Sequence, residues 1–114
     1  MRLACWGLGF LVLLVAAGAA EEKKVVHVVA ERFSFVPSQI KVSQGAIVEF
    51  RLRSEDTNHG FRIPEAGINV VIPKRGRGET TILFRATTKG RFAFACSKPC
   101  GAGHNMMRGI LIVE

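Results

Sequence analysis

The feature that most constrains the fold is a series of short segments in which apolar and polar residues alternate. The alternation is clear over residues 40–42, 46–53, 79–86 and 91–95. A period of two is typical of strands that bury one face in a core. Glycine and proline interrupt the segments at short intervals, and no segment has the 3.6-residue period of an amphipathic helix. The pattern argues against a helical bundle and favours an all-β fold.

Further strands are expected around these segments. The additional candidates share apolar residues bounded by turn signals: residues 25–30, Phe33 with Phe35 before Pro37, residues 61–63 and residues 108–113. Residues 64–78 are predicted to be a long connection, which contains the apolar run 68–72. We expect about six to eight short strands in a β-sandwich with Greek-key connections.

The beginning of the chain differs in composition from the rest. Residues 3–20 carry no charge, with an apolar stretch at 8–15 and small residues at 17–20. This is the pattern of a secretory signal peptide. The alternative is an uncleaved membrane anchor, because a spanning helix needs about 17 to 25 residues. Both interpretations predict a signal or anchor over residues 1–20 and one domain over residues 21–114. That domain would be periplasmic or otherwise extracytoplasmic, either soluble or N-terminally anchored.

The predicted domain is basic. Residues 21–114 carry fifteen Lys and Arg against nine Asp and Glu, a net charge of +6 with neutral histidines. The densest basic stretch is residues 74–77. We expect no nucleic-acid partner, because an exported protein rarely meets nucleic acid and no helical basic stripe is present. The stretch is interpreted as a solvated loop, with an anionic partner or membrane surface as the alternative.

The most informative segment is residues 96–107, a loop rich in glycine and proline that precedes the last strand. It contains Cys96, Cys100, His104 and Met107. Thiolates, an imidazole and a thioether are soft ligands, which select copper over magnesium, calcium or manganese. Two cysteines alone in an exported domain would more often form a disulfide. The histidine and methionine beside them favour a metal site.

A further ligand is expected from another part of the chain. His59 lies in the turn-forming stretch 54–61 at the end of a strand segment, where a side chain can reach an adjacent loop. The alternative is an ordinary surface histidine. His27 stands alone in the first strand and is interpreted as structural or exposed. Cys5 and Trp6 precede the apolar stretch of the signal and are assigned no role.

Two of these segments resemble a known family. Residues 96–107 match the Cys-x3-Cys-x3-His-x2-Met pattern of the binuclear copper-A site in cytochrome c oxidase subunit II and nitrous oxide reductase. Residues 56–61 are similar to the Asp-x-x-His-x-Phe region that holds the first histidine of that family. The resemblance extends over residues 25–114, including the stretches 35–37 and 45–50. It implies a cupredoxin-like Greek-key β-sandwich.

The resemblance also implies a ligand set for two copper ions. The implied ligands are the bridging thiolates of Cys96 and Cys100, His59 with Met107 on one copper, and His104 with the backbone carbonyl of Lys98 on the other. Met106 is expected to be a neighbour of the site and not a ligand. Such a set saturates both coppers, so the chain is expected to carry electrons and not to catalyse a reaction at an open metal position. A blue site with one copper needs only one cysteine.

The redox partner does not follow from the resemblance. Subunit II proteins have a membrane anchor, usually a hairpin, and an aromatic electron-entry surface with tryptophan, whereas residues 21–114 contain neither Trp nor Tyr. The family residue that donates its carbonyl is usually acidic, and here it is Lys98. A net charge of +6 would also repel a basic cytochrome c.

Three functions therefore stand as hypotheses. The first is an exported electron carrier with a binuclear copper centre that serves an oxidase or reductase. The second is a copper-handling protein that stores copper or exchanges it with a copper-delivery protein. The third is a structural domain in which Cys96 and Cys100 form a disulfide.

Overall fold

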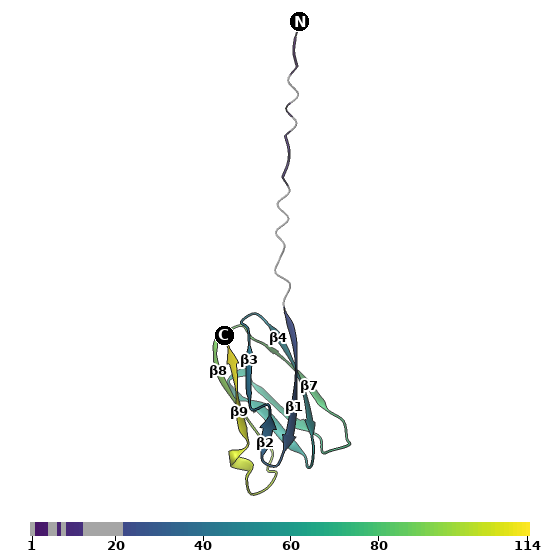
Figure 1. The fold of residues 1–114 in the computed structure, drawn as a ribbon, viewed down its shortest axis with the longest axis vertical. Coiled ribbons are helices and arrows are strands. Elements are labelled where there is room, and N and C mark those ends of the chain that lie inside the picture. The colour runs from purple at the N-terminus through teal and green to yellow at the C-terminus, as the bar shows by residue number, and fades with distance from the viewer. Residues whose placement is uncertain (1, 5–6, 8, 13–21) are drawn as a thin grey trace.

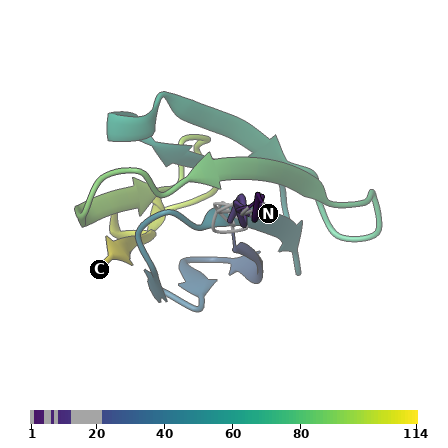
Figure 2. The same cartoon turned by 90° about the horizontal axis from the view of Figure 1, so that it is seen from above.

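The computed structural model describes residues 2–4, 7, 9–12 and 22–114. Most of the described chain forms two β-sheets that pack face to face, as the two views in Figures 1 and 2 show. The strands of the described part are β1 (Lys23–Glu31), β2 (Ser34–Val36), β3 (Gln39–Val42), β4 (Ile47–Ser54), β5 (His59–Ile63), β6 (Ile68–Ile72), β7 (Thr80–Arg85), β8 (Gly90–Ala95) and β9 (Arg108–Val113). Two short 3₁₀ turns, η1 (Pro64–Ala66) and η2 (His104–Met106), are its helical elements.

The strand order identifies a Greek-key sandwich. One sheet has the order β2-β1-β4-β7, and the other has the order β3-β9-β8-β5-β6. Strands β1 and β4 run parallel, as do β3 and β9, whereas the remaining pairs are antiparallel. Parallel neighbours require the chain to cross between the sheets instead of turning back in a hairpin. The predicted all-β Greek-key β-sandwich is confirmed.

One segment differs from its prediction. Residues 68–72, expected to lie within a long connection, form strand β6 and pair with β5 along its whole length. The described part therefore contains nine strands, more than the six to eight expected. The run is short and lies close to Gly67 and Pro73, so its sequence resembles that of a loop. The antiparallel edge that β5 offers decides the outcome, because a strand is stabilised by the partner with which it pairs.

A phenylalanine cluster occupies the core between the sheets. Phe35, Phe50, Phe61 and Phe94 are each at most 1% exposed. Phe61 is in the middle, with ring centroids 5.6 Å from Phe35, 5.6 Å from Phe50 and 5.1 Å from Phe94. Aromatic rings at such separations attract one another beyond the effect of burying their area. Because Phe61 lies on β5 two residues after His59, this cluster supports the strand that carries the histidine.

The loops that matter for function lie at one end of the sandwich. The connection from β4 to β5 and the connection from β8 to β9 both lie at the lower end in Figure 1. Strand β1 begins at the opposite end of the sandwich from these loops (Figure 1). The loop between β6 and β7 projects from the side of the sandwich (Figure 2).

The N-terminal segment makes no contribution to the core where it is described. Leu3, Phe10, Leu11 and Val12 are 74% to 95% exposed. Within the described residues, no helix has the length and apolar character needed to cross a membrane. The predicted cleavage positions 17–20, together with Cys5 and Trp6, lie outside the described residues. The choice between a signal peptide and an anchor stays a prediction.

Truncating the central ring of the cluster should destabilise the domain. Phe61→Ala removes a side chain that is 0% exposed and leaves a cavity between three other rings. We expect the free energy of unfolding to fall by about 3 to 5 kcal/mol, measured by urea unfolding followed by circular dichroism. Leu83→Ala, at a position that is 62% exposed, is the control and should change stability by less than about 0.5 kcal/mol.

Candidate metal centre

The loop from β8 to β9 brings its two cysteines together. Cys96 and Cys100 are free thiols, 3% and 6% exposed, with their Sγ atoms 3.8 Å apart. A disulfide would need a separation of about 2 Å, so the disulfide predicted under the structural hypothesis is not formed here. The backbone N–H of Cys96 donates a hydrogen bond of 3.0 Å to the carbonyl of Met107, which closes the base of the loop. Both sulfurs therefore project from one short, pinned segment.

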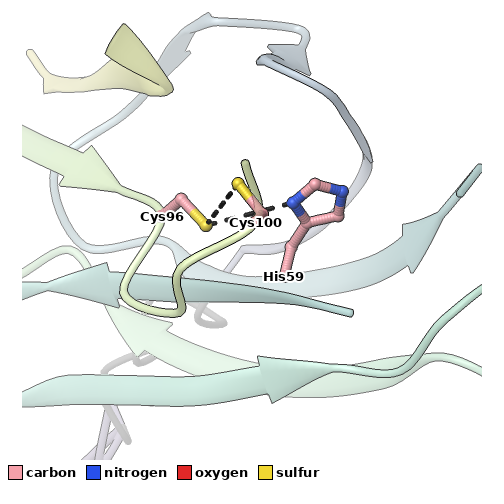
Figure 3. A group of neighbouring side chains, drawn as sticks. All are labelled: His59, Cys96 and Cys100. Carbon is pink, nitrogen blue, oxygen red and sulfur yellow. Dashed lines mark hydrogen bonds between the residues drawn. The ribbon is translucent and has the colours of Figure 1, made fainter. Parts of the chain in front are cut away.

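The histidine comes from the point where the connection from β4 enters β5. His59 is the first residue of β5 and is 0% exposed. Its Nδ1 atom lies 3.9 Å from the Sγ of Cys96, as Figure 3 shows with Cys100 beside them. The ligand atoms of these three residues all lie within 4.8 Å of one another. Two thiols and an imidazole nitrogen at this spacing are close enough together to bind a common metal ion.

The remaining predicted ligands lie around the same thiols. His104 Nδ1 is 3.6 Å from the Sγ of Cys100, and Met107 Sδ is 3.9 Å from that sulfur. The carbonyl oxygen of Lys98 lies 3.1 Å from the Sγ of Cys96. Met107 is 1% exposed, whereas its neighbour Met106 is 74% exposed.

All six predicted site residues are thus brought to one place. His27, which was assigned no ligand role, is exposed on β1. The roles of the six residues as ligands stay a prediction. Their donor chemistry fits copper, because thiol sulfur, thioether sulfur and imidazole nitrogen are the atoms that this metal prefers.

A carboxylate holds the buried histidine from behind. Asp56 Oδ1 lies 2.6 Å from His59 Nε2, which leaves Nδ1 facing the thiols. The same carboxylate accepts hydrogen bonds from the backbone N–H groups of Arg32, at 2.8 Å, and of Thr57, at 2.7 Å. Burial by itself would raise the pKa of Asp56, but these hydrogen bonds and that from His59 outweigh it and lower the pKa. The carboxylate is therefore an anionic anchor for the ring.

Arg32 and Phe33 are functional neighbours that the sequence did not reveal. The guanidinium Nε of Arg32 donates a hydrogen bond of 3.0 Å to the carbonyl of Cys100, across 68 positions of sequence. Phe33 packs against the cysteine loop so closely that a Cβ at Gly103 would lie 3.0 Å from the Cβ of Phe33. The spacing of three between Asp56 and His59 was a usable signal for the carboxylate. No sequence signal could have identified Arg32, because its contact is made only by the packing of distant loops.

Only glycine fits at position 60, because the cysteine loop packs directly against its backbone. A Cβ at this position would lie 2.8 Å from the backbone nitrogens of both Ser97 and Lys98. The absence of a side chain lets the backbone N–H of Gly60 approach the Sγ of Cys96 to 3.4 Å. N–H groups directed at sulfur stabilise a thiolate. Glycine at position 60 therefore permits both the close packing of the cysteine loop and the N–H contact to the sulfur of Cys96.

The metal-free site keeps a thiol protonated. Burial, followed by the neighbouring Cys96 and Asp56, raises the pKa of Cys100 from 9.0 to about 11, although Arg32 acts to lower it. A copper ion binds the thiolate, so loading the site must release protons. The apolar surroundings thus favour neutral thiols in the absence of metal, and thiolates only where a bound cation balances their charge.

The fold and the donor cluster together define a small β-sandwich domain with a candidate metal-binding site in the loops at one end. The family profile described as cupredoxin-like domain matches residues 4–113, so the chain belongs to the cupredoxin-like domain family. This confirms the cupredoxin-like fold expected from the two ligand segments.

Curated relatives are more specific. Cytochrome c oxidase subunit 2 of Thermus thermophilus is 36% identical over 91 residues, which cover 78% of this chain and 64% of the relative. Cytochrome c oxidase subunit 2 of Synechocystis is 34% identical over 64 residues. The chain spans less than two thirds of the length of these relatives.

Solved structures agree with this relationship. A heme-copper terminal oxidase dimer contains a chain that is 29% identical, with a TM-score of 0.66, covering 80% of this chain and 65% of that one. The periplasmic domain of subunit II of cytochrome oxidase from Bradyrhizobium japonicum has a TM-score of 0.73 over 85% of this chain and 88% of its own. At 15% identity the latter similarity concerns the fold alone. The expected resemblance to cytochrome c oxidase subunit II is confirmed.

Neutralising the anchor of His59 should weaken metal binding. In Asp56→Asn the ring loses its anionic partner, and we expect the affinity for Cu(I) to fall by about 10- to 100-fold. Competition against a chromophoric Cu(I) chelator measures the change. Glu55→Gln is the matched control, because Glu55 is the adjacent carboxylate and pairs with Arg53 instead of His59. Equal affinities in the two variants would contradict the anchoring role.

The metal-free domain should lose stability in alkaline solution. A group whose pKa rises on folding stabilises the fold fully below its unfolded pKa, here about 9, and the effect is lost as the pH rises towards about 11. Urea unfolding of metal-free protein at several pH values should show this loss, whereas Cys100→Ser should show a smaller one. Lysine titration is common to both proteins and cancels in the comparison. Equal losses would refute the assignment to Cys100.

Proposed function

We propose that this domain transfers electrons through a binuclear copper centre of the copper-A type. The observation that supports this most strongly is a pair of free, buried thiols 3.8 Å apart within reach of one another and of two imidazole nitrogens. One thiol would suffice for a single-copper blue site. Two thiols whose sulfurs face each other are the donors needed to bridge a metal pair.

Each ligand has an assigned role in this proposal. Cys96 and Cys100 would hold both ions with their thiolates, His59 and Met107 would complete the ligands of one ion, and His104 and the carbonyl of Lys98 those of the other. The contacts given above support the assignment, since each terminal donor lies 3.1 to 3.9 Å from one of the sulfurs. When bound, the copper pair supplies a one-electron redox step.

The protein contributes exclusion of water and a fixed geometry. His59, Cys96, Cys100 and Met107 are each no more than 6% exposed. The hydrogen bond that closes the loop and the Asp56 anchor both restrain the donors. Donors that do not move when the charge changes keep the cost of reorganisation low, which favours rapid electron transfer.

The domain is proposed to act as the electron-entry part of a terminal oxidase and not as the catalyst. Its curated relatives are subunits of cytochrome c oxidase, and the assigned ligands leave no open metal position for a substrate. Its partners would be a redox protein and a copper-delivery protein. An extracytoplasmic location is proposed, because the related domain from Bradyrhizobium japonicum is periplasmic. With β1 entering at the opposite end, the copper end would point away from an N-terminal attachment.

Copper stoichiometry and electron paramagnetic resonance test the proposal. Protein from residue 21 onward, purified under reducing conditions and loaded with copper, should contain two coppers that share one unpaired electron. The expected spectrum is a hyperfine pattern of seven lines, because the electron is delocalised over two copper nuclei. A single copper with four lines would replace the proposal with a blue site. Exchangeable Cu(I) without a redox signal would replace it with copper handling.

Two substitutions sharpen this test. Cys100→Ser should abolish the seven-line spectrum, since one sulfur cannot form the double bridge. Met107→Leu should retain the two coppers and mainly shift the reduction potential, because a weak thioether ligand tunes the potential more than it holds the metal. Copper analysis and voltammetry measure the two effects. An unchanged spectrum and copper count in Cys100→Ser would show that the binuclear assignment is wrong.

A further inference from the structure

The end of the sandwich that carries the candidate metal centre is cationic. Two hydrogen bonds tie the loop between β6 and β7 to this end, from the backbone N–H of Lys74 to Asn58 Oδ1 at 2.7 Å and from that of Arg75 to the carbonyl of Asp56 at 3.0 Å. The exposed bases on the loops of this end are Arg32, Lys74, Arg75, Arg77, Lys98 and Arg108. They belong to three separate parts of the chain, because Lys98 and Arg108 share the stretch that leads into β9, so their gathering is a property of the fold.

The carboxylates nearest the site do not balance this charge. Asp56 is directed inward to His59, and Glu55 is paired with Arg53. Glu31 and Glu79 are the other carboxylates on the described strand ends and loops here, and both are exposed. Arg108 directs its guanidinium to the carbonyl of Asn105 at 2.7 Å, which leaves its charge uncompensated. The outward-facing charge at this end is therefore positive.

The loop between β8 and β9 exposes apolar residues close in sequence to the most accessible predicted ligand, His104. His104 is half-buried, whereas the four other side-chain ligands are at most 6% exposed. Met106 is 74% exposed, and Pro99 and Ala102 are exposed beside it. An apolar centre with a charged rim is the usual composition of a protein docking surface. Three bases adjoin these apolar residues: Lys98 precedes Pro99 in the chain, Arg32 donates to the carbonyl of Cys100, and Arg108 donates to that of Asn105.

We propose that this face docks an acidic redox protein, one whose surface around its own cofactor is rich in Asp and Glu. The inference rests on the proposed electron-transfer function and names the kind of partner that the site serves. Opposite charges on the two faces steer the encounter and raise the association rate, while a basic partner is repelled. One electron passes from the reduced partner to the oxidised centre in the complex, and no covalent bond forms or breaks.

Stopped-flow kinetics with two protein probes of opposite charge test the inference. The probes are a reduced acidic plant-type ferredoxin and a reduced basic mitochondrial cytochrome c, each mixed with the oxidised copper-loaded domain. The rate of electron transfer from ferredoxin should fall as the salt concentration is raised from about 10 to 200 mM, because salt screens the attraction between opposite charges. The cytochrome should show the opposite dependence on salt. A rate with ferredoxin that is independent of salt would overturn the inference.

Charge reversal locates the docking face. Arg77→Glu combined with Arg108→Glu should lower the ferredoxin rate by about three- to tenfold at low ionic strength. Lys89→Glu combined with Arg91→Glu changes the net charge equally but lies at the opposite end of the sandwich, where β8 begins. This control should change the rate by less than twofold, roughly, because it leaves the local field intact. Arg77→Lys with Arg108→Lys should retain the rate, since it keeps the charge. Equal losses in the two charge-reversed proteins would refute a local docking face.

Two further readouts separate the possible failures. Copper content and the resonance spectrum are recorded for every variant before the kinetics. If no redox centre forms in the parent domain, the proposed function fails and this inference fails with it. If the centre is intact and the kinetics ignore the local charge, the inference alone fails. Binding to phosphatidylglycerol vesicles that depends on Arg77 and Arg108, without an effect on the ferredoxin rate, would assign the face to an anionic membrane and overturn the inference.

Discussion

The site end of this domain depends on the burial of a histidine ring among sulfur atoms. A buried polar atom is costly unless it has a partner, and His59 has two ring nitrogens to satisfy at 0% exposure. Asp56 takes Nε2, so Nδ1 is left to face Cys96. The carboxylate must in turn be held, and backbone N–H groups of Arg32 and Thr57 do this. The need to pair the ring nitrogens of His59 thus positions the segments that follow β1 and β4.

The same network makes the cysteine loop rigid from outside. Arg32 gives its backbone N–H to Asp56 and its guanidinium to the carbonyl of Cys100, so one residue joins the histidine side of the site to the thiol side. Phe33 fills the space beside the loop that a side chain at Gly103 would need. Hydrogen bonds behind the ligands orient them and tune a bound metal. The arrangement suits a centre whose donors stay in place while an electron enters and leaves.

The interior and the exterior of the site end have opposite electrostatic characters. Inside, a carboxylate and two thiols provide negative or potentially negative groups, and burial together with Cys96 and Asp56 raises the pKa of Cys100 to about 11. Outside, the exposed side chains of this end include arginines and lysines together with the apolar Met106. Because Asp56 is directed inward, its charge stabilises the site without cancelling the outward field. The division lets one end of a small domain hold a cation and still attract an anionic partner.

Local patterns in the sequence determined the class of fold and the donor atoms. Alternation at residues 46–53 and 91–95 reflects one buried face per strand, and the spacing within residues 96–107 sets which donors share a loop. Strand β6 could not be predicted, because its short apolar run becomes a strand only beside β5. Only the tertiary structure decided that Arg32 reaches the carbonyl of Cys100 and that bases from three separate parts of the chain share one end. Those contacts depend on how the two sheets bring distant loops together, and no local spacing encodes that arrangement.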